Sequence, residues 1–401
     1  MKKKNILAVV IMTLAAALLL SACGLSGGDE NPSVVFSKNP AGVVGFTVSD
    51  TPLTQEEAVS NGYSLSADDK HEVSYSSRKA SATYDELCGY GMDNDIFYPG
   101  ALVDIETMTP ISIAQAPLSI SLGGAEGWIG NSSAPISTIV QAPRTDTMRE
   151  GIRLIINGIL GSGDITTHGQ LSFSIHEIES EQDFQLGIGM GYKGYGVDMK
   201  DKFSFSNMNK STNLVMVLKQ VYYTVDVSRP AAEYDFFANT VTNEQLKTAI
   251  PASKIPTYVA SVSYGRMVMI SIQSNFSKKQ IENELTASFG NKLIGEITAD
   301  SNLKTIVQSH DTDISCFVYG GSQEDSNKIA TAAAAKDFDK IISAMLGNYD
   351  PKSNIGLPLS YKFRHLDGSL ALMRSSDEYD IKTVKYLPEK VINWSYLDSL
   401  I

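Results

Sequence analysis

The sequence has little tryptophan, few cysteines and a shortage of positive charge. Its 401 residues include two Trp and three Cys, and 33 Lys and Arg stand against 45 Asp and Glu, which gives a formal net charge of −12. A surface of that sign is unsuited to nucleic acid or another polyanion, so such partners are not expected. With 43% hydrophobic and 19% charged residues, the composition is that of a folded protein of two or three domains.

Long apolar runs are also missing after the N-terminus, where no stretch reaches the roughly eighteen residues of a membrane-spanning helix. Any membrane crossing by this part of the chain would have to be made by β-strands. Beyond Cys23, the cysteines are Cys88 and Cys316. Their spacing leaves open whether they form a disulfide or stay as two separately buried thiols.

The N-terminus carries the clearest local signal. Lysines at positions 2–4 precede an apolar run from Ile6 to Leu20, followed by Ser-Ala-Cys23, as in a secretory signal peptide. The ending resembles a bacterial lipoprotein signal, which implies a signal peptide over 1–22, a lipidated Cys23 and a tether over 23–35. The expected location is then the cell envelope or outer surface, with a lipid anchor. The alternative is a plain signal peptide with an incidental cysteine.

Enzyme motifs are absent from the sequence. It has no Walker loop and no HExxH pair, and its one Gly-x-Ser-x-Gly match, at 24–28, lies in the expected tether and not in the strand–turn–helix setting of a nucleophile elbow. Gly189, Gly191 and Gly194 match the dinucleotide fingerprint in spacing, but no helical pattern follows them. The five histidines are scattered without metal-ligand spacing, and the acidic run over 177–183 predicts a solvated face. We therefore expect no enzyme, catalytic residue, metal or cofactor.

Strand patterns dominate the remainder of the chain. β-branched and aromatic residues are dense over Asn213–Val227 and Ser261–Gln273, as in buried or half-buried strands. Shorter candidates lie at 258–262, 314–319 and 370–373.

Three amphipathic runs predict helices between these strands. Two follow candidate capping boxes at Thr147–Glu150 and Ser277–Gln280. The third runs from about Asp337 to Leu346, before Gly347. The mixture predicts an α+β fold, with helices beside an antiparallel sheet.

The segment 278–300 fits two periods at once. Its apolar residues recur at every fourth position, which suits one face of a helix and also one face of a strand. Two alanines, Ala287 and Ala299, fall on the strand face too. The residues at spacing four are Ile281, Leu285, Phe289, Leu293 and Ile297.

Two further stretches alternate apolar and polar residues. The first, over 163–176, places Ile165, Leu171, Phe173 and Ile175 on one face, at about the length of one transmembrane β-strand. The second, over 184–192, continues the pattern. A half-buried strand of a soluble sheet would look the same.

Six segments occur in an order that resembles the thiol-activated, cholesterol-dependent cytolysins, over roughly Phe46 to Tyr386. The segments are Tyr98–Leu102, Lys219–Val225, Val262–Arg266, Tyr319–Ser322, Lys336–Phe338 and Leu357–Tyr361. The resemblance implies an elongated cytolysin-like (MACPF/CDC) fold, with a central twisted antiparallel sheet flanked by two helical clusters. It implies assembly of soluble monomers into a ring on a lipid membrane, where the two clusters become transmembrane hairpins.

By position, the first cluster corresponds to about Arg144–Thr167 and the second to about Phe276–Ser301. The membrane-insertion residues implied are Ile165, Leu171, Phe173, Ile175, Ile281, Leu285, Ala287, Phe289, Leu293 and Ile297. Because a spacing of four drifts around a helix, we expect a break near Gly290–Asn291.

The resemblance implies roles for three more residues. Gly320 and Gly321 match the family's glycine pair, a hinge from which a short blocking strand swings off the sheet edge; glycine suits it because it reaches backbone angles closed to other residues. Lys336 matches a cation that pairs with an acid on the neighbouring subunit, although no matching acid occurs over Ser137–Arg144.

The sequence departs from the family at its end, where fifteen residues follow Tyr386. We expect the family's Trp-rich, immunoglobulin-like recognition domain to be absent, and cholesterol binding is not predicted. The expected domains are a scaffold (36–136 with 200–260), a central sheet with the insertion segments (137–199 with 261–350), and a neck strand with the C-terminus (351–401).

Two functions are consistent with these expectations. The first is a lipid-anchored pore-forming protein, acting alone or with a second cytolysin-like homologue. The alternative is a non-lytic cell-surface binding lipoprotein on the same fold, because a fold does not fix a function.

Overall fold

The computed structural model describes residues 34–65, 70–123, 134–161, 169–190, 192, 199, 203, 209–293, 303–346 and 354–387, with the side chains of 290–293 and 346 excepted. Residues Phe36–Ile401 form one compact unit. The predicted signal peptide, Cys23, Ile165 and Ile297 lie outside the described residues.

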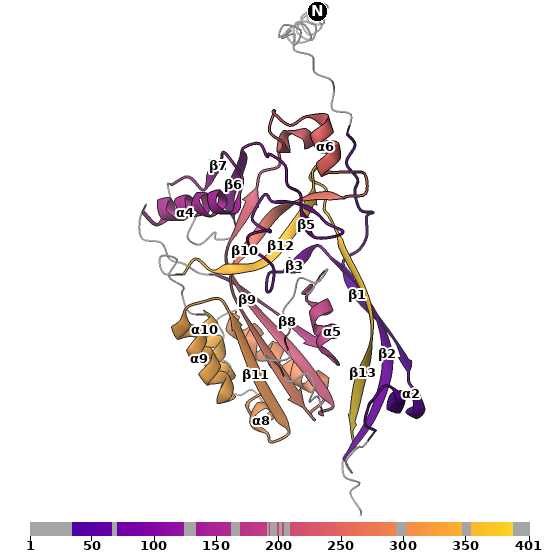
Figure 1. Cartoon of the computed structure of the whole chain (residues 1–401). Helices are drawn as coiled ribbons and strands as arrows, with labels where there is room; N and C mark the ends of the chain where they lie inside the picture. The colour runs from indigo at the N-terminus through magenta and orange to yellow at the C-terminus, as the bar shows by residue number, and fades with distance from the viewer. Residues whose placement is uncertain are drawn as a thin grey trace, which may run out of the picture. The chain divides into compact units, whose positions relative to one another are not determined.

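Among the regular elements of the described chain, strands hold more residues than helices (Figure 1). They are β1 (Gly45–Pro52), β2 (His71–Tyr84), β3 (Glu86–Cys88), β4 (Leu102–Asp104), β5 (Thr109–Pro110), β6 (Leu118–Gly123), β7 (Ser137–Val140), β8 (Gln170–Glu177), β9 (Thr212–Val227), β10 (Pro256–Ser274), β11 (Thr312–Tyr319), β12 (Leu357–His365) and β13 (Met373–Tyr386). The helices are α2 (Gln55–Ser60), α4 (Thr145–Gly161), α5 (Glu181–Gly187), η3 (Glu233–Phe236), α6 (Asn243–Ala249), α7 (Lys278–Leu293), α8 (Leu303–Gln308), α9 (Gln323–Ala334) and α10 (Phe338–Leu346).

The larger sheet is antiparallel and centres on β9 and β10, which pair from Ser261↔Asp226 to Ser274↔Thr212. One half of it has the order β8-β9-β10-β11. The other half of the sheet contains six more strands, which bring the total among the described strands to ten: β3, β4, β5, β6, β7 and β12. Both predicted long strands are confirmed, and β10 also includes the predicted strand at 258–262.

Apolar side chains cover both faces of the β8-β9-β10-β11 half. On β9, Leu214, Met216 and Leu218 point to the cluster that holds α7, α8, α9 and α10. Their neighbours Val215 and Val217 point the other way, to a cluster with Phe184 of α5. Because strand side chains alternate between faces, these clusters lie on opposite sides of the sheet. The α+β fold with helices beside a central antiparallel sheet is confirmed.

A second sheet has the order β1-β2-β13. Strands β2 and β13 pair without interruption from His71↔Tyr386 to Tyr84↔Met373. The first strand, β1, runs along the other edge of β2. Strand β13, in the segment expected to form the neck, therefore lies in one sheet with β1 and β2 from the start of the described chain.

Several local predictions were wrong. The stretch 184–192 is no strand: Ser180 caps α5 by accepting a hydrogen bond from the Asp183 N–H. Thr147 lies inside the first turn of α4 rather than before it. Helix α7 also continues through Gly290 and Asn291 without the expected break. From Ile281 to Phe289 a spacing of four drifts by only about 80° around a helix, so these residues share one face without a break.

Candidate functional site

Helix α7 lies on the sheet through a short apolar stripe. Ile281, Leu285 and Phe289 are completely buried and belong to the cluster that includes β9 and β10. The ring of Phe289 lies 5.7 Å from Phe173 of β8 and 6.4 Å from Phe338 of α10, between ring centroids. The period-four pattern is thus used as a helix face in this structure.

Ala287 is exposed on the opposite side of α7. Position 287 distinguishes a helix from a strand, because Ala287 belongs to the apolar face only if the segment is a strand. Leu293 lies in the last turn of the helix, and its side chain is outside the described set.

Strand β8 contributes the other predicted insertion residues. Leu171, Phe173 and Ile175 are half-buried and pack against the cluster of α7. The alternate residues Ser172 and Ser174 are exposed. Among the described strands, only β9 pairs with β8, so β8 forms an edge of the sheet.

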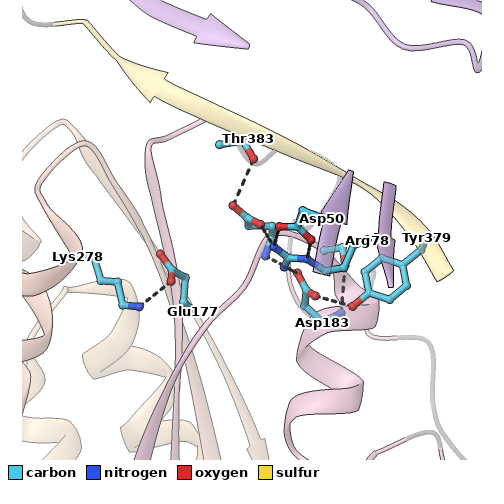
Figure 2. Close-up of polar contacts among 9 residues, drawn as sticks. Asp50, Arg78, Glu177, Asp183, Lys278, Tyr379 and Thr383 are labelled. Carbon is cyan, nitrogen blue, oxygen red and sulfur yellow. Dashed lines mark hydrogen bonds and ion pairs between the residues drawn. The ribbon is translucent and has the colours of Figure 1, made fainter. Parts of the chain in front are cut away.

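The start of α7 is fixed to the end of β8. The Ser277 hydroxyl accepts a hydrogen bond from the Gln280 N–H at 3.3 Å, as predicted for an N-cap. The Lys278 ammonium forms an ion pair with Glu177 of β8 at 2.6 Å (Figure 2). Both side chains are exposed, so this pair contributes little stability and could be broken at little cost.

A cluster of charges joins the smaller sheet to the chain between β8 and α5 (Figure 2). The guanidinium of Arg78, on β2, donates to Asp50 at 2.6 and 2.7 Å, to Glu179 at 2.6 Å and to Asp183 at 2.8 Å. The Asp183 side chain is only 2% exposed and that of Arg78 11%. One arginine thus holds three carboxylates from two parts of the fold; we call these four residues the Arg78 cluster.

Strand β13 supports the same contact. The Tyr379 hydroxyl donates to Asp183 at 2.5 Å, and the Thr383 hydroxyl donates to Glu179 at 3.3 Å. Burial raises the pKa of Glu179, with Arg78 acting against the rise. The hydrogen bond from Arg78 lowers the pKa of the more exposed Asp50.

Sequence reasoning missed this cluster. The acidic run over 177–183 was predicted to be a solvated face, but Glu181 and Asp183 are buried. The density of acidic residues was the only signal in the segment itself. The cation that pairs with these acids, Arg78, lies about a hundred residues earlier in the sequence.

The glycine pair lies where β11 ends. Gly320 and Gly321 have φ of +79° and +86°, a region open mainly to glycine. A Cβ on Gly320 would lie 2.8 Å from the carbonyl oxygen of Gly265. The chain then enters helix α9, and among the described strands only β10 pairs with β11, so no blocking strand covers that edge in the described residues.

Comparison with known proteins decides the family. A sequence profile of the thiol-activated cytolysins matches residues 47–386. The chain belongs to the thiol-activated cytolysin family. Members of this family are pore-forming toxins and not enzymes.

Individual cytolysins are distant in sequence. Ivanolysin of Listeria ivanovii is 26% identical over 309 residues, covering 74% of this chain and 56% of ivanolysin. Tetanolysin of Clostridium tetani is 26% identical over 317 residues, covering 75% and 56%. The chain therefore spans about half the length of the curated cytolysins that it matches.

Solved cytolysin structures share the fold. The human-specific toxin intermedilysin superposes with a TM-score of 0.62 at 17% identity, over 88% of this chain and 73% of intermedilysin. Listeriolysin O gives a TM-score of 0.58 at 19% identity, over 80% and 66%.

In this cytolysin chain, Lys336 has a role within the subunit. It adopts a φ of +53°, and its ammonium donates to the backbone carbonyl groups of Ser309 and Thr312. The acid on a neighbouring subunit that the resemblance implied for Lys336 stays a prediction.

The two cysteines do not pair. Cys88 and Cys316 are free thiols, and they belong to the clusters on opposite faces of the sheet. Burial raises the pKa of Cys316 to about 12, so its thiol is unreactive near neutral pH.

The described residues contain neither a metal-binding group of side chains nor a membrane-spanning helix. No group of three His, Cys, Asp or Glu side chains there is placed to hold a metal ion. No helix of this part combines the length and the apolar character that a membrane crossing needs.

Proposed function

We propose that this cytolysin chain is a lipid-anchored pore-forming protein, in which α7 and the residues after it convert from helix to transmembrane β-hairpin. The observation that carries the proposal is the dual use of one stripe. Ile281, Leu285 and Phe289 are buried as a helix face, and the same residues with Ala287 would form one face if the segment became a strand.

The surroundings of α7 support such a conversion. The ion pair between Lys278 and Glu177 is exposed and is inexpensive to break. A hairpin formed by 276–301 would continue from the end of β10, which already pairs with β9 and β11. Once α7 leaves the sheet, strand β8 would expose a second apolar face at the sheet edge, formed by Leu171, Phe173 and Ile175.

Assembly of several copies belongs to the same proposal. Backbone groups at an open strand edge cannot remain unpaired in lipid, so the hairpins must close into a ring. The edge strands β8 and β11 are suited to pair between neighbouring copies, with Gly320 and Gly321 as the hinge beside β11. A second cytolysin-like homologue is an alternative neighbour in this ring.

The lipid anchor is the remaining part. A diacylated Cys23 would hold the chain at a membrane, and partition of the exported protein into detergent, lost in Cys23→Ser, is the expected result. Full partition by Cys23→Ser would rule the anchor out.

The pore is tested by scanning α7. Single cysteines at positions 280–289, in a Cys88→Ala/Cys316→Ala background, are labelled with an environment-sensitive dye. The protein is a His-tagged chain of residues 24–401, without Cys23, held on nickel-lipid liposomes. Emission that alternates with a period of about two, together with leakage of trapped dye, supports the strand.

Cysteines at positions 324–333 of α9 serve as the control, since α9 is not proposed to enter the membrane. A period near 3.6 in both helices without leakage, even after a homologue is added, would exclude the pore and favour the non-lytic surface-binding function.

A further inference from the structure

A cavity of about 610 Å³ lies between helix α4 and the larger sheet, far along the chain from α7. Its volume is within the range of small-molecule sites in proteins. Helix α4 contributes the apolar side chains of Met148, Ile152 and Ile156, together with the polar Thr145, Arg149, Arg153 and Asn157. The opposite wall is aromatic and consists of Phe97, Tyr98, Tyr223, Tyr264 and Tyr361.

Hydrogen bonds and ring contacts hold the aromatic wall in place. Tyr223 and Tyr264 stack with ring centroids 5.2 Å apart and planes 15° from parallel. The Tyr223 hydroxyl donates to the carbonyl oxygen of Ile355 at 2.8 Å, and the Tyr361 hydroxyl donates to Asn94 at 2.6 Å. Because these contacts already fix the rings within the fold, little ordering would be needed on binding.

Two arginines of α4 line the same cavity. Arg149 pairs with Asp95 at 2.9 Å, and Arg153 pairs with Glu150 at 2.7 Å. All four side chains are largely exposed, so these pairs are weak, and each guanidinium has donors to spare. The Arg149 charge acts against the rise that burial causes in the pKa of Tyr264, which indicates that the guanidinium lies near the aromatic wall.

We propose that this cavity binds a single-chain anionic amphiphile. The alkyl chain lies between the aliphatic face of α4 and the tyrosines, and the phosphate or carboxylate head lies at Arg149 and Arg153. The apolar walls favour an alkyl chain over a sugar or a nucleotide, and two cations at one position favour an anionic head over a neutral or cationic one. The inference does not depend on the proposed pore.

The binding test uses the full chain and dodecyl phosphate below its micelle concentration, followed by titration calorimetry. One saturable site is expected. Decyl phosphate should bind about fifteen-fold more weakly, because each methylene group contributes about fourfold. Dodecyltrimethylammonium, with the same chain and the opposite charge, should bind at least tenfold more weakly. A titration with inorganic phosphate alone tests whether the site binds a free anion or needs the alkyl chain of an amphiphile.

Variants assign the site to this cavity. Arg149→Gln/Arg153→Gln should weaken dodecyl phosphate at least tenfold without weakening dodecyltrimethylammonium, whose head the two arginines repel. Ile156→Trp should weaken both by filling the space. Arg144→Gln is the matched control, because Arg144 is an equally exposed arginine beside the start of α4 outside the cavity lining.

Three results would overturn the proposal. Equal binding by Arg149→Gln/Arg153→Gln, Arg144→Gln and the unmodified chain would place the amphiphile elsewhere, for example on the apolar N-terminal run that all variants share. Binding of inorganic phosphate as tight as that of dodecyl phosphate would leave only an anion site. No binding at all would leave the cavity as a packing gap. The arginine substitutions are at exposed positions, so a folding failure is not expected to hide these outcomes.

Discussion

Phe289 of α7 lies against Phe173 of β8, with ring centroids 5.7 Å apart and planes inclined by 42°. The contact means that one helix covers the apolar face of an edge strand. If α7 leaves the sheet, it exposes its own stripe and also the half-buried side chains of β8. Both become available to lipid in the same step, which ties the two predicted insertion segments together.

Adjacent residues of α7 distinguish helix from strand. Thr286 and Ala287 are both exposed in the structure, so Thr286→Asp and Ala287→Asp should each change the free energy of unfolding by less than about 0.5 kcal/mol. On a membrane strand Ala287 faces lipid, where a charge costs energy, and Thr286 faces the lumen. We expect Ala287→Asp to reduce liposome leakage at least tenfold and Thr286→Asp to leave it unchanged. Equal leakage by the two variants would contradict the strand register.

The Arg78 cluster should stabilise the junction of the smaller sheet with α5. In Arg78→Gln, the nearly buried Asp183 loses its counterion, and breaking such a pair costs about 3 kcal/mol. Chemical unfolding followed by circular dichroism measures the loss. Lys79→Gln is the neighbouring control, since Lys79 and Glu378 form an exposed pair worth less than about 1 kcal/mol. A similar small effect in both variants would show that the cluster is not a structural link.

His176 should make stability depend on pH. Burial, with a smaller effect of Lys219, lowers the pKa of His176 below its ordinary 6.5. Below that pH the unfolded chain binds the proton before the folded one does, so the contribution is complete above 6.5 and is lost as the pH falls toward the folded pKa.

The free energy of unfolding should therefore fall as the pH drops below 6.5, by about 1.4 kcal/mol for each unit of pKa difference, and it should fall less steeply in His176→Gln. Denaturant titrations across this range measure it, with exposed His310→Gln as the control. If His176→Gln keeps the slope of the unmodified chain, the assignment to His176 is wrong.

Gly320 should not tolerate a side chain. A φ of +79° and a Cβ only 2.8 Å from the Gly265 oxygen predict a loss of about 1–3 kcal/mol in Gly320→Ala. Gly161→Ala is the matched control, since a Cβ there meets nothing within 4 Å and alanine suits the end of a helix. Thermal unfolding compares the two, and equal midpoints would mean that the turn relaxes freely.

The sequence predicted the elements whose side-chain spacing is itself the cause of their structure. Strands β9 and β10 follow from runs of β-branched and aromatic residues, and α10 buries Phe338, Ile341, Ile342 and Met345 as its period requires. Helix α7 was predicted with its alternative as a strand. The ordered motifs also indicated the family, because they are spread over most of the chain.

The tertiary structure decided which segments meet. Residues 184–192 alternate like a strand, yet Ser180 caps a helix there and Phe184 fills the core beside β9. Arg144–Thr167 was expected beside the central sheet, and the described part of it, α4, packs on β6 and β7 of the larger sheet rather than on the β8-β9-β10-β11 half that α7 covers. The apolar face of α4 then lines the cavity that Tyr223, Tyr264 and Tyr361 border on the other side.

The acidic run over 177–183 shows the physical reason most clearly. By itself the sequence determined that the segment carries carboxylates and that α7 carries a stripe at spacing four. Whether a carboxylate is solvated or buried depends on a cation brought to it by folding, and here Arg78 of β2 is that cation. Local periodicity is a property of neighbouring residues, whereas burial of charge depends on contacts between residues far apart in the chain, and only the tertiary structure supplies them.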